Sequence, residues 1–251
     1  LTGIEDHSPT GFSPSDVRAF KEIEAYKNFN SGHEPIWTFI LILARDGGSM
    51  NRIEHLNATV EIIQQINHQF AVKDITFAQI CENFCDINEA VVQYRNALII
   101  KSAAVENGEL LTDSITNLSY PISNSLGFDY DLTMHFFGVE TYRESEMSNK
   151  TLSNIKHLQM VLLMFRAEQP DQWDDTDVRR WDRSISNFYL NGYNNSFIRP
   201  LIYSLSYAQD EIVRVGTTLQ PYSIIGFIFI TVFSIITVYI NLRQANQVGC
   251  P

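Results

Sequence analysis

The sequence lacks the short motifs that mark common catalytic sites. It contains no G-x-S-x-G, H-E-x-x-H, G-x-G-x-x-G or Walker A pattern. Its six histidines are scattered, and His55 and His68, on one expected helix, lie too far apart in sequence to share a metal. Each is expected to be a surface or half-buried side chain. We therefore expect no enzyme, no catalytic residue, no metal site and no cofactor.

Basic residues are in short supply. The chain has 18 Lys and Arg against 29 Asp and Glu, which gives a formal net charge of −11. Nucleic-acid phosphates and anionic lipid surfaces both select for basic faces, so the charge argues against either as an electrostatic partner. Hydrophobic residues make up 45% of the 251 positions, enough for a packed core.

The first residues do not form a secretory signal. The chain begins with Leu1, and residues 1–12 contain neither a basic n-region nor an apolar h-region. A domain outside the cell needs some route there. We therefore expect that the N-terminus has been lost or that the chain is an excerpt of a longer protein.

Cysteine is rare too. Cys81 and Cys85 lie four apart in ICENFCD, and Cys250 stands alone near the end. Two cysteines are too few for a zinc site, which needs four ligands. In an oxidising compartment Cys81 and Cys85 could form a disulfide across one helical turn, and the alternative is two unpaired buried thiols.

Two further clusters have plain structural interpretations. One is a group of four aspartates, Asp171, Asp174, Asp175 and Asp177. These could suggest a calcium site, but they lack the spacing and the glycine of an EF-hand loop and fit a capped helix start better. The other is the set of three tryptophans, which are expected in the core rather than in a ligand box; they are Trp37, Trp173 and Trp181.

One apolar run near the C-terminus decides the broad class. No charge occurs from Val215 to Leu242, and residues 222–241 supply the roughly 20 apolar positions that a membrane helix needs. A buried helix of a soluble protein is the alternative, but such helices are usually shorter and carry a polar stripe. The polar residues inside the run have hydroxyls that can bond to the helix's own carbonyls; they are Ser223, Thr231, Ser234 and Thr237.

The orientation follows from the residues that flank this run. Arg243 just beyond it predicts a cytoplasmic C-terminal end. We therefore expect residues 1–220 to be an extracellular or lumenal domain, 221–242 the transmembrane helix and 243–251 a cytoplasmic stub. Four N-x-S/T sequons are compatible with an exterior location without proving it; they begin at Asn57, Asn117, Asn149 and Asn194.

Hydrophobic periodicity predicts an alternation of strands and helices. A capping box, Ser13 with Asp16 around Pro14, begins a helix that ends before Pro35. The apolar run 36–44 predicts a buried strand, and spacings of three and four predict an amphipathic helix over 51–70. Residues 75–106 are expected to be an insertion of short helices around the cysteine pair.

The second half continues the pattern. Strands are expected in 114–123, demoted to an edge or short strand by Pro121, in 132–141 and, centrally, in 155–169. A helix with an acidic first turn should follow, then an alternating strand that includes Leu205 and Tyr207. The segment AQDEIVRVGTTLQ should be a short helix. The order predicts an α+β domain of the ferredoxin-like, split β-α-β type with a helical insertion.

Several stretches, in this order, resemble the nematode Patched-related proteins of the resistance–nodulation–division superfamily. They are DITFAQICENFCDIN with Cys81 and Cys85, ITNLSYPISNSLGFDYDL with Tyr120, Pro121 and Gly127, FFGVE at 136–140, and PYSIIGFIFITVFSI from Pro221. The resemblance covers nearly the whole chain. It implies that residues 4–220 are the first ectodomain, with a ferredoxin-like core, and that 222–241 are the second transmembrane helix, which opens a sterol-sensing domain.

The resemblance also implies a function. The family is implicated in moving or sensing sterols and other lipids, with ion-coupled transport as the driver, at the plasma membrane or in endosomes. The implied partners are a sterol or other lipid, the membrane, and the missing transmembrane helices and second ectodomain of the same protein. A sterol would pass beside the helix into an apolar tunnel of the ectodomain. The small or hydroxyl-bearing Gly226, Ser234 and Thr237 could face the sterol or, alternatively, pack against neighbouring helices.

Departures from the family pattern bear on this function. The first transmembrane helix, the later helices with their intramembrane acids and the second half of the transporter are not in the sequence, so this fragment should not transport alone. A different class of function is a single-pass membrane protein whose ectodomain binds a protein ligand, and an inactive decoy is a third.

Overall fold

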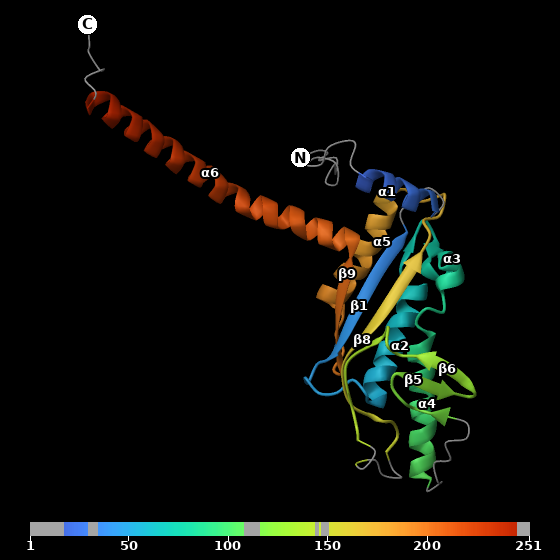
Figure 1. Cartoon of the computed structure of the whole chain (residues 1–251). Helices are drawn as coiled ribbons and strands as arrows, with labels where there is room; N and C mark the ends of the chain where they lie inside the picture. Colours follow the sequence, from blue (N-terminus) through green and yellow to red (C-terminus); the bar gives the residue numbers. More distant parts are fainter. Residues whose placement is uncertain (1–17, 30–34, 108–115, 144–145, 147–150, 245–251) are drawn as a thin grey trace. The chain divides into compact units, whose positions relative to one another are not determined.

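The computed structural model describes residues 18–29, 35–107, 116–143, 146 and 151–244, and it divides into two compact units, Leu1–Leu205 and Ser206–Pro251. The elements are α1 (Arg18–Phe29), β1 (Ile36–Ala44), α2 (Ile53–His68), β2 (Ala71–Val72), β3 (Ile75–Thr76), α3 (Phe77–Ile80), the 3₁₀ helix η1 (Glu82–Phe84), α4 (Glu89–Glu106), β4 (Thr116–Asn117), β5 (Ile122–Ser125), β6 (Phe128–Asp131), β7 (Phe136–Thr141), β8 (Ile155–Ala167), α5 (Asp175–Asn187), the π-helical turn η3 (Phe188–Gly192), β9 (Ile198–Ser204) and α6 (Leu205–Gln244) (Figure 1).

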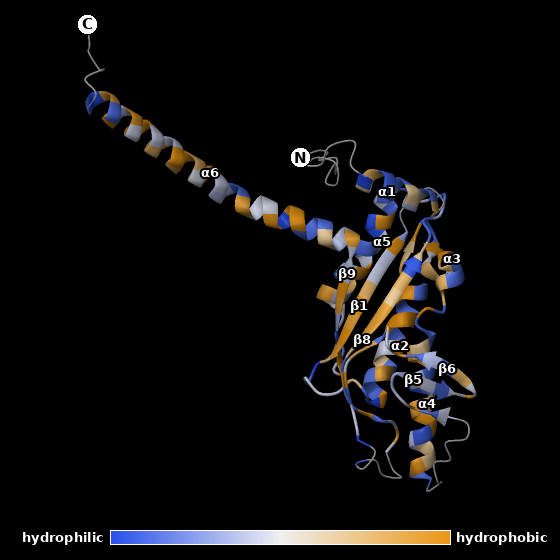
Figure 2. Cartoon of the chain, viewed as in Figure 1, coloured by the Kyte–Doolittle hydropathy of each residue, from blue (hydrophilic) through white to orange (hydrophobic). Residues whose placement is uncertain are grey.

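The first unit is built on a four-stranded antiparallel sheet in the order β7-β8-β1-β9. β1 and β8 are its central strands, as their apolar sequences predict, and both are orange along much of their length in Figure 2. The chain is therefore α+β, as expected. A small three-stranded sheet, β4-β5-β6, and the β2-β3 hairpin lie in the long connections between strands.

Helices cover one face of the four-stranded sheet. The buried residues of β1 alternate along the strand, and Thr38 on that side donates from Oγ1 to Asp182 of α5 at 2.8 Å. On the same side, Trp181 of α5 stacks on Phe77, and Tyr94 of α4 meets Phe136 of β7 edge to face. In Figure 1, α2 and α4 lie behind β1 and β8.

The insertion contains more than the short helices expected over 75–106. α4 is a single helix of 18 residues, and β2 and β3 form a hairpin before the cysteine pair. The capping box at Ser13 lies outside the described residues, and the helix it should start is described from Arg18. The segment around Pro121 forms two short strands, β4 and β5, in agreement with the effect expected of that proline.

The C-terminal end of the sheet differs from the prediction. β9 ends at Ser204, so Leu205 and Tyr207 belong to helix α6 rather than to the strand. AQDEIVRVGTTLQ is not a separate short helix either, because α6 runs for 40 residues from Leu205 to Gln244, with Pro221 inside it. Helix-favouring residues such as Ala208, Gln209 and Glu211 outweigh the short alternation that suggested a longer strand.

Candidate functional site

The face of the sheet opposite the helices is apolar and partly exposed to solvent; we call it the open face. The register places Phe39 of β1 between Met164 of β8 and Tyr203 of β9, and Leu41 between Leu162 and Leu201. Directly opposed residues in an antiparallel pair point to the same side. The apolar side chains of the open face are Trp37, Phe39, Leu41, Leu43, Phe137, Met160, Leu162, Met164, Leu201 and Tyr203.

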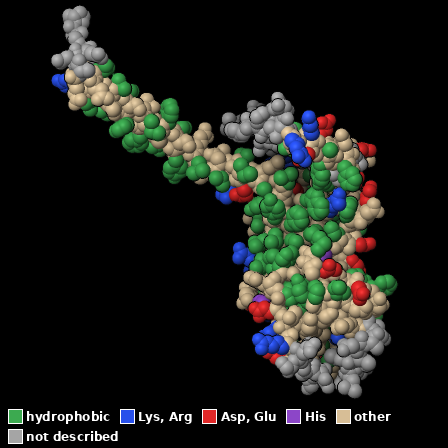
Figure 3. Space-filling model, in the orientation of Figure 1, with side chains coloured by type: hydrophobic (Ala, Val, Ile, Leu, Met, Phe, Trp, Pro, Cys, Tyr) green, Lys and Arg blue, Asp and Glu red, His purple; other side chains and the backbone are tan. Residues whose placement is uncertain are grey.

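Most of these side chains are less buried than those under the helices, although Met164 is only 6% exposed. Tyr203 is 54% exposed and Phe137 40%, whereas Ile40 and Ile42 on the helix side are fully buried. Figure 3 shows apolar side chains gathered over the front of the four-stranded sheet. Contiguous apolar surface of this kind usually marks a contact with a lipid, a ligand or another protein. The open face is therefore the strongest candidate for a functional site in the described domain.

An aromatic row runs across one end of the open face. The rings of Trp37 and Phe39 stack with centroids 5.6 Å apart, and Phe39 lies 6.4 Å from Tyr203. Arg166 places its guanidinium carbon 5.1 Å from the Trp37 ring centroid and 3.9 Å from that of Phe84. Each such cation–π contact is worth roughly 0.5–2 kcal/mol. Trp37 is thus part of an exposed face, not of the core as predicted.

The disulfide lies next to this row. Cys81 and Cys85 are bonded, with Cα atoms 4.9 Å apart, which agrees with the disulfide interpretation of the spacing. Cys81 is buried at the end of α3 and Cys85 is exposed after η1. The bond closes the short segment that carries Phe84, so it helps to hold that ring against Arg166.

Basic side chains stand at the other end of the open face. Arg199 of β9 is opposite Leu43 in the register, and Arg45 follows two residues after Leu43 along β1, where its backbone N–H donates to the Phe197 carbonyl at 2.9 Å. Both side chains are exposed. Arg166 lies at the aromatic end, so arginines occur at both ends of the open face.

α6 contains the predicted membrane span. Among the residues that the structure describes, α6 is the one helix that is long enough and apolar enough to cross a membrane. Its most apolar stretch is not buried against other parts of the described chain. Ser234 donates to the Ile230 carbonyl and Thr237 to the Phe233 carbonyl, both at 2.8 Å, as expected for hydroxyls inside a membrane helix. Gly226 has no heavy atom within 4 Å of where a Cβ would be, so its face is open.

The sequons fall in different environments. Asn117 and Asn194 are exposed, and Asn149 lies outside the described residues. Asn57 lies within α2, where its Oδ1 accepts a hydrogen bond of 3.1 Å from Arg95. Thr59 of the same sequon is fully buried and donates from Oγ1 to the His55 carbonyl.

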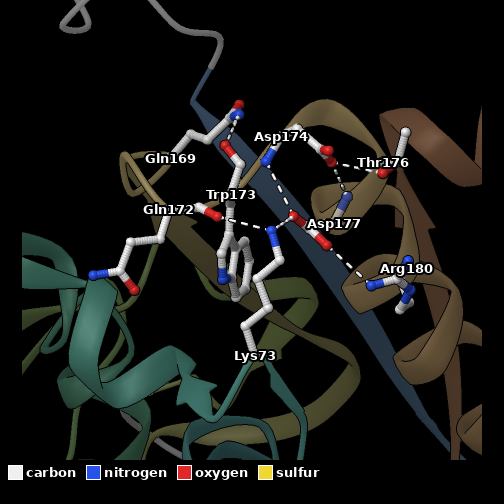
Figure 4. Close-up of polar contacts among 8 residues, drawn as sticks. All are labelled: Lys73, Gln169, Gln172, Trp173, Asp174, Thr176, Asp177 and Arg180. Atoms are coloured by element: carbon white, nitrogen blue, oxygen red, sulfur yellow. Dashed lines mark hydrogen bonds and ion pairs between the residues drawn. The ribbon is translucent and has the colours of Figure 1, made fainter.

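The acidic cluster caps a helix. Asp174 accepts a hydrogen bond from the backbone N–H of Asp177 at 2.9 Å, and the Asp177 side chain accepts from the N–H of Asp174 at 3.1 Å (Figure 4). Lys73 reaches from the β2-β3 turn and donates to the Asp177 carboxylate and to the Gln172 carbonyl. The capped-helix interpretation of these aspartates is thus confirmed, and no group of three or more metal-ligating side chains occurs among the described residues.

The histidines that the structure describes do not cluster into a metal site. His68 is exposed at the end of α2, while His55 is 4% exposed and packs 5.6 Å from the Phe197 ring. Burial and the nearby Arg52 lower the pKa of His55. No hydrogen bond to the His55 Nδ1 atom is present in the described part of the chain. A buried neutral imidazole of this kind responds to pH without binding a ligand.

A pocket of about 710 Å³ lies between α2, α4 and the start of β8. Its lining is mainly polar, with Asn51, Arg52, Glu54, Ser102 and Lys156 among the residues. An apolar sterol needs apolar walls, so this pocket does not match the tunnel that the resemblance implies.

No protein-family model, curated protein or solved structure matches the chain. The open face is therefore judged on its own chemistry.

The apolar runs of β1 and β8 are the sequence signal that corresponds to the open face. The apolar run 36–44 was predicted to be a buried strand and the run 158–165 to lie in a central strand; helices cover one side of both strands, and the other side is only partly buried. Uninterrupted runs predict two apolar faces and do not say what covers each of them.

Proposed function

We propose that this chain is part of a Patched-like membrane protein that handles or senses sterols or other lipids, anchored by the apolar segment of α6. The observation that carries the proposal is that two apolar surfaces are exposed in one chain, the open face of the sheet and residues 222–241 of the helix. Both would be covered in a larger assembly, by lipid and by further transmembrane helices and a second ectodomain of the same protein.

The strand order supports the ferredoxin-like part of this proposal. When the insertion and the small sheets are set aside, the elements follow as β1, α2, β7, β8, α5 and β9, and the sheet order is β7-β8-β1-β9. A split β-α-β fold with two helices on one face has this succession and these antiparallel neighbours. The disulfide and two exposed sequons suit a domain on the extracellular or lumenal side, at the plasma membrane or in endosomes.

Lipid handling would use hydrophobic contact as its main source of affinity. Burying apolar surface contributes about 25 cal/mol per Å², and the open face offers apolar side chains of varied shape. In the membrane helix, Gly226, Ser234 and Thr237 are the candidates for lipid or helix contact. No residue of the described chain is assigned to ion coupling.

Thermal unfolding of the full chain tests the proposal. A sterol that binds the folded state at a hundred times its Kd stabilises it by about 2.7 kcal/mol. We expect cholesterol in phosphatidylcholine nanodiscs to raise the melting temperature of the ectodomain, and an equal mole fraction of diacylglycerol to do less. Equal melting temperatures with and without sterol would contradict a sterol site in this chain.

The alternative is a single-pass protein whose ectodomain binds a protein ligand, and the open face is the feature that favours it. A full-length transcript separates the two. Further apolar segments of about 20 residues on both sides of this region support the transporter-like protein. A cleavable signal before the domain and a stop after Pro251 would support the single-pass receptor.

A further inference from the structure

Helix α6 is longer than a membrane span requires. It has 40 residues, from Leu205 to Gln244, and is one unbroken helix in Figure 1. At 1.5 Å per residue this length is roughly 60 Å, whereas the hydrocarbon layer of a bilayer is about 30 Å thick. With residues 222–241 as the span, the part of α6 before Tyr222 lies in water. We call residues 205–221 the stalk.

The stalk carries exposed aliphatic side chains along one line. Ile212 is 69% exposed, Val215 50% and Leu219 54%. Their spacing of three and four residues puts them on the same side of the helix. Most neighbouring stalk positions are polar: Gln209, Asp210, Glu211, Arg214, Thr217, Thr218 and Gln220. A line of apolar side chains on a segment in water marks a contact with another molecule or segment.

This apolar line continues into the span with the same spacing, in alternate steps of three and four residues from Ile212 to Ile240. We call it the seam; its residues are Ile212, Val215, Leu219, Tyr222, Gly226, Phe229, Phe233, Ile236 and Ile240. Apart from the Tyr222 phenol, the seam has no polar side chain. The other polar residues of 212–241 lie off it: Arg214, Thr217, Thr218, Gln220, Ser223, Thr231, Ser234, Thr237 and Asn241. An apolar repeat sustained in this way over four heptads indicates a coiled coil.

The period of the seam indicates what kind of surface covers it. A strict seven-residue repeat drifts by about 20° per heptad around a straight helix, so the seam winds around α6. A bilayer surface or a sheet face, which does not wind with the helix, would favour a period of 3.6 residues instead. A second helix that supercoils with α6 follows the seam along its whole length. The partner is therefore a helix.

We propose that α6 pairs in parallel with α6 of a second copy of this chain, along the seam. The inference rests on the membrane anchoring of α6 in the proposed function. Insertion gives two copies the same direction and depth, so each seam residue meets its own counterpart around a two-fold axis. Gly226 has no heavy atom within 4 Å of where a Cβ would be, and a glycine on the seam lets two helix backbones approach closely.

The charged side chains of the stalk are compatible with this pairing. In a parallel coiled coil, the residue just before one a position faces the residue just after the next d position of the partner helix. With Ile212 at a and Val215 at d, Glu211 faces Gly216 of the second copy. Glu211 is also bonded to Arg214 of its own helix at 2.6 Å. No like charges therefore face each other across this part of the seam.

Other features of α6 lie away from the contact. Pro221 is off the seam, so the backbone hydrogen bond that a proline removes is not replaced by a gap between the two helices. Ser234 and Thr237, the candidates for lipid contact, are off the seam too. Pairing and lipid contact can therefore occur on the same helix.

Energy transfer between donor-labelled and acceptor-labelled full-length chains in phosphatidylcholine vesicles tests the pairing. Val215→Asp should weaken self-association by at least about tenfold, because it places two carboxylates against each other on the seam. Val213→Asp is the matched control, since Val213 is 56% exposed and lies two residues away, off the seam. This variant should associate as the natural chain does.

Cross-linking locates the contact independently. In a Cys250→Ser background, single cysteines on the seam, Val215→Cys or Leu219→Cys, should form linked dimers under mild oxidation. Thr217→Cys and Gln220→Cys lie off the seam, and their cross-linking should be about ten times slower because a disulfide needs closely spaced Cβ atoms. Equal rates at all four positions would overturn the proposal.

An alkaline carbonate wash of the vesicles reports separately on the anchoring, and both valine variants should be retained. Release of the natural chain by the wash would overturn the anchoring and the pairing with it. A retained natural chain without energy transfer would overturn the pairing alone and assign the seam to another helix of the same protein. Equal weakening by Val213→Asp and Val215→Asp would also overturn the pairing, and it would leave the proposed lipid handling unaffected.

Discussion

The ammonium group of Lys73 lies 2.5 Å from the carboxylate of Asp177, whose side chain is only 3% exposed. Lys73 has a φ of 51° in the two-residue turn between β2 and β3, and Asp177 closes the capping box of α5. One ion pair thus fixes the insertion to a helix that follows it by about a hundred residues of chain. This hydrogen bond is also the main cause of the lowered pKa of Asp177.

Removal of this lysine should destabilise the domain. Lys73→Met leaves the buried Asp177 carboxylate paired with Arg180, whose side chain is 64% exposed. We expect a loss of about 1–2 kcal/mol in the free energy of unfolding, less than for a fully buried pair because Lys73 is itself 49% exposed.

Chemical unfolding of the full chain, followed by tryptophan fluorescence, measures this loss. Arg18→Met is the control, since Arg18 and Glu22 are 90% and 61% exposed and their pair should contribute little.

The ion pair of Lys73 and Asp177 also gives a pH dependence of stability. Because the folded pKa of Asp177 lies below its ordinary 3.8, its contribution is present above pH 3.8 and is lost as pH falls through the folded value. Equal stability of Lys73→Met and the natural chain would contradict the account.

His55 should make the domain less stable in mild acid. Its folded pKa is below the ordinary 6.5, so the unfolded chain binds more protons as pH falls below 6.5. The groups around it are Arg52, Asp46, Glu54 and the Phe197 ring. The melting temperature should therefore fall from pH 7 to pH 5, and less so in His55→Gln. His68→Gln, on the exposed end of α2, should keep the natural pH dependence.

The disulfide should stabilise the segment beside the aromatic row. Closing so short a loop reduces the entropy of the unfolded chain by an amount worth about 2 kcal/mol. For a domain of this size we expect Cys81→Ala with Cys85→Ala to lower the melting temperature by roughly 4–8 °C. Reductant should lower that of the natural chain and leave the double variant unchanged. A double variant as stable as the oxidised chain would show that the bond contributes nothing.

Glycosylation of each sequon should depend on whether its asparagine is exposed. Asn117 and Asn194 are exposed, whereas Asn57 is held by Arg95 within α2 and Thr59 of that sequon is fully buried. In a secretory-pathway host we expect Asn117→Gln and Asn194→Gln each to remove one glycan from the intact mass, and Asn57→Gln to remove none. Loss of a glycan in Asn57→Gln would mean that this helix is modified before it folds.

Local signals in the sequence predicted much of the fold. The continuous run 36–44 predicted β1 to the residue, and the three-and-four spacing over 51–70 predicted α2, observed at 53–68, to within two residues at each end. The cysteine spacing and the acidic start of α5 were also interpreted correctly. These features depend on neighbours a few residues apart, which is the range over which sequence patterns are informative.

Long-range relationships were not predictable in the same way. Nothing near Lys73 in the sequence indicates that it pairs with Asp177, and the apolar run of β1 does not reveal which side the helices cover. The turn between β5 and β6, in which Leu126 has a φ of 54° and Gly127 one of 86°, was not predicted because a Leu-Gly pair lacks the usual Asn-Gly signature. The end of β9 was predicted too late in the sequence. The apolar alternation along the strand continues through Leu205 and Tyr207, which belong to the first turn of α6.

Mapping of peptides labelled by a photoreactive sterol tests the central claim most directly. The full-length protein in phosphatidylcholine vesicles would be irradiated with the sterol, with and without excess cholesterol, and its labelled peptides identified by mass spectrometry. The account predicts labels that cholesterol competes away, in residues 222–241 or on the open face at Phe39, Leu41 or Leu201. Absence of competed label from both regions would contradict lipid handling by this part of the protein.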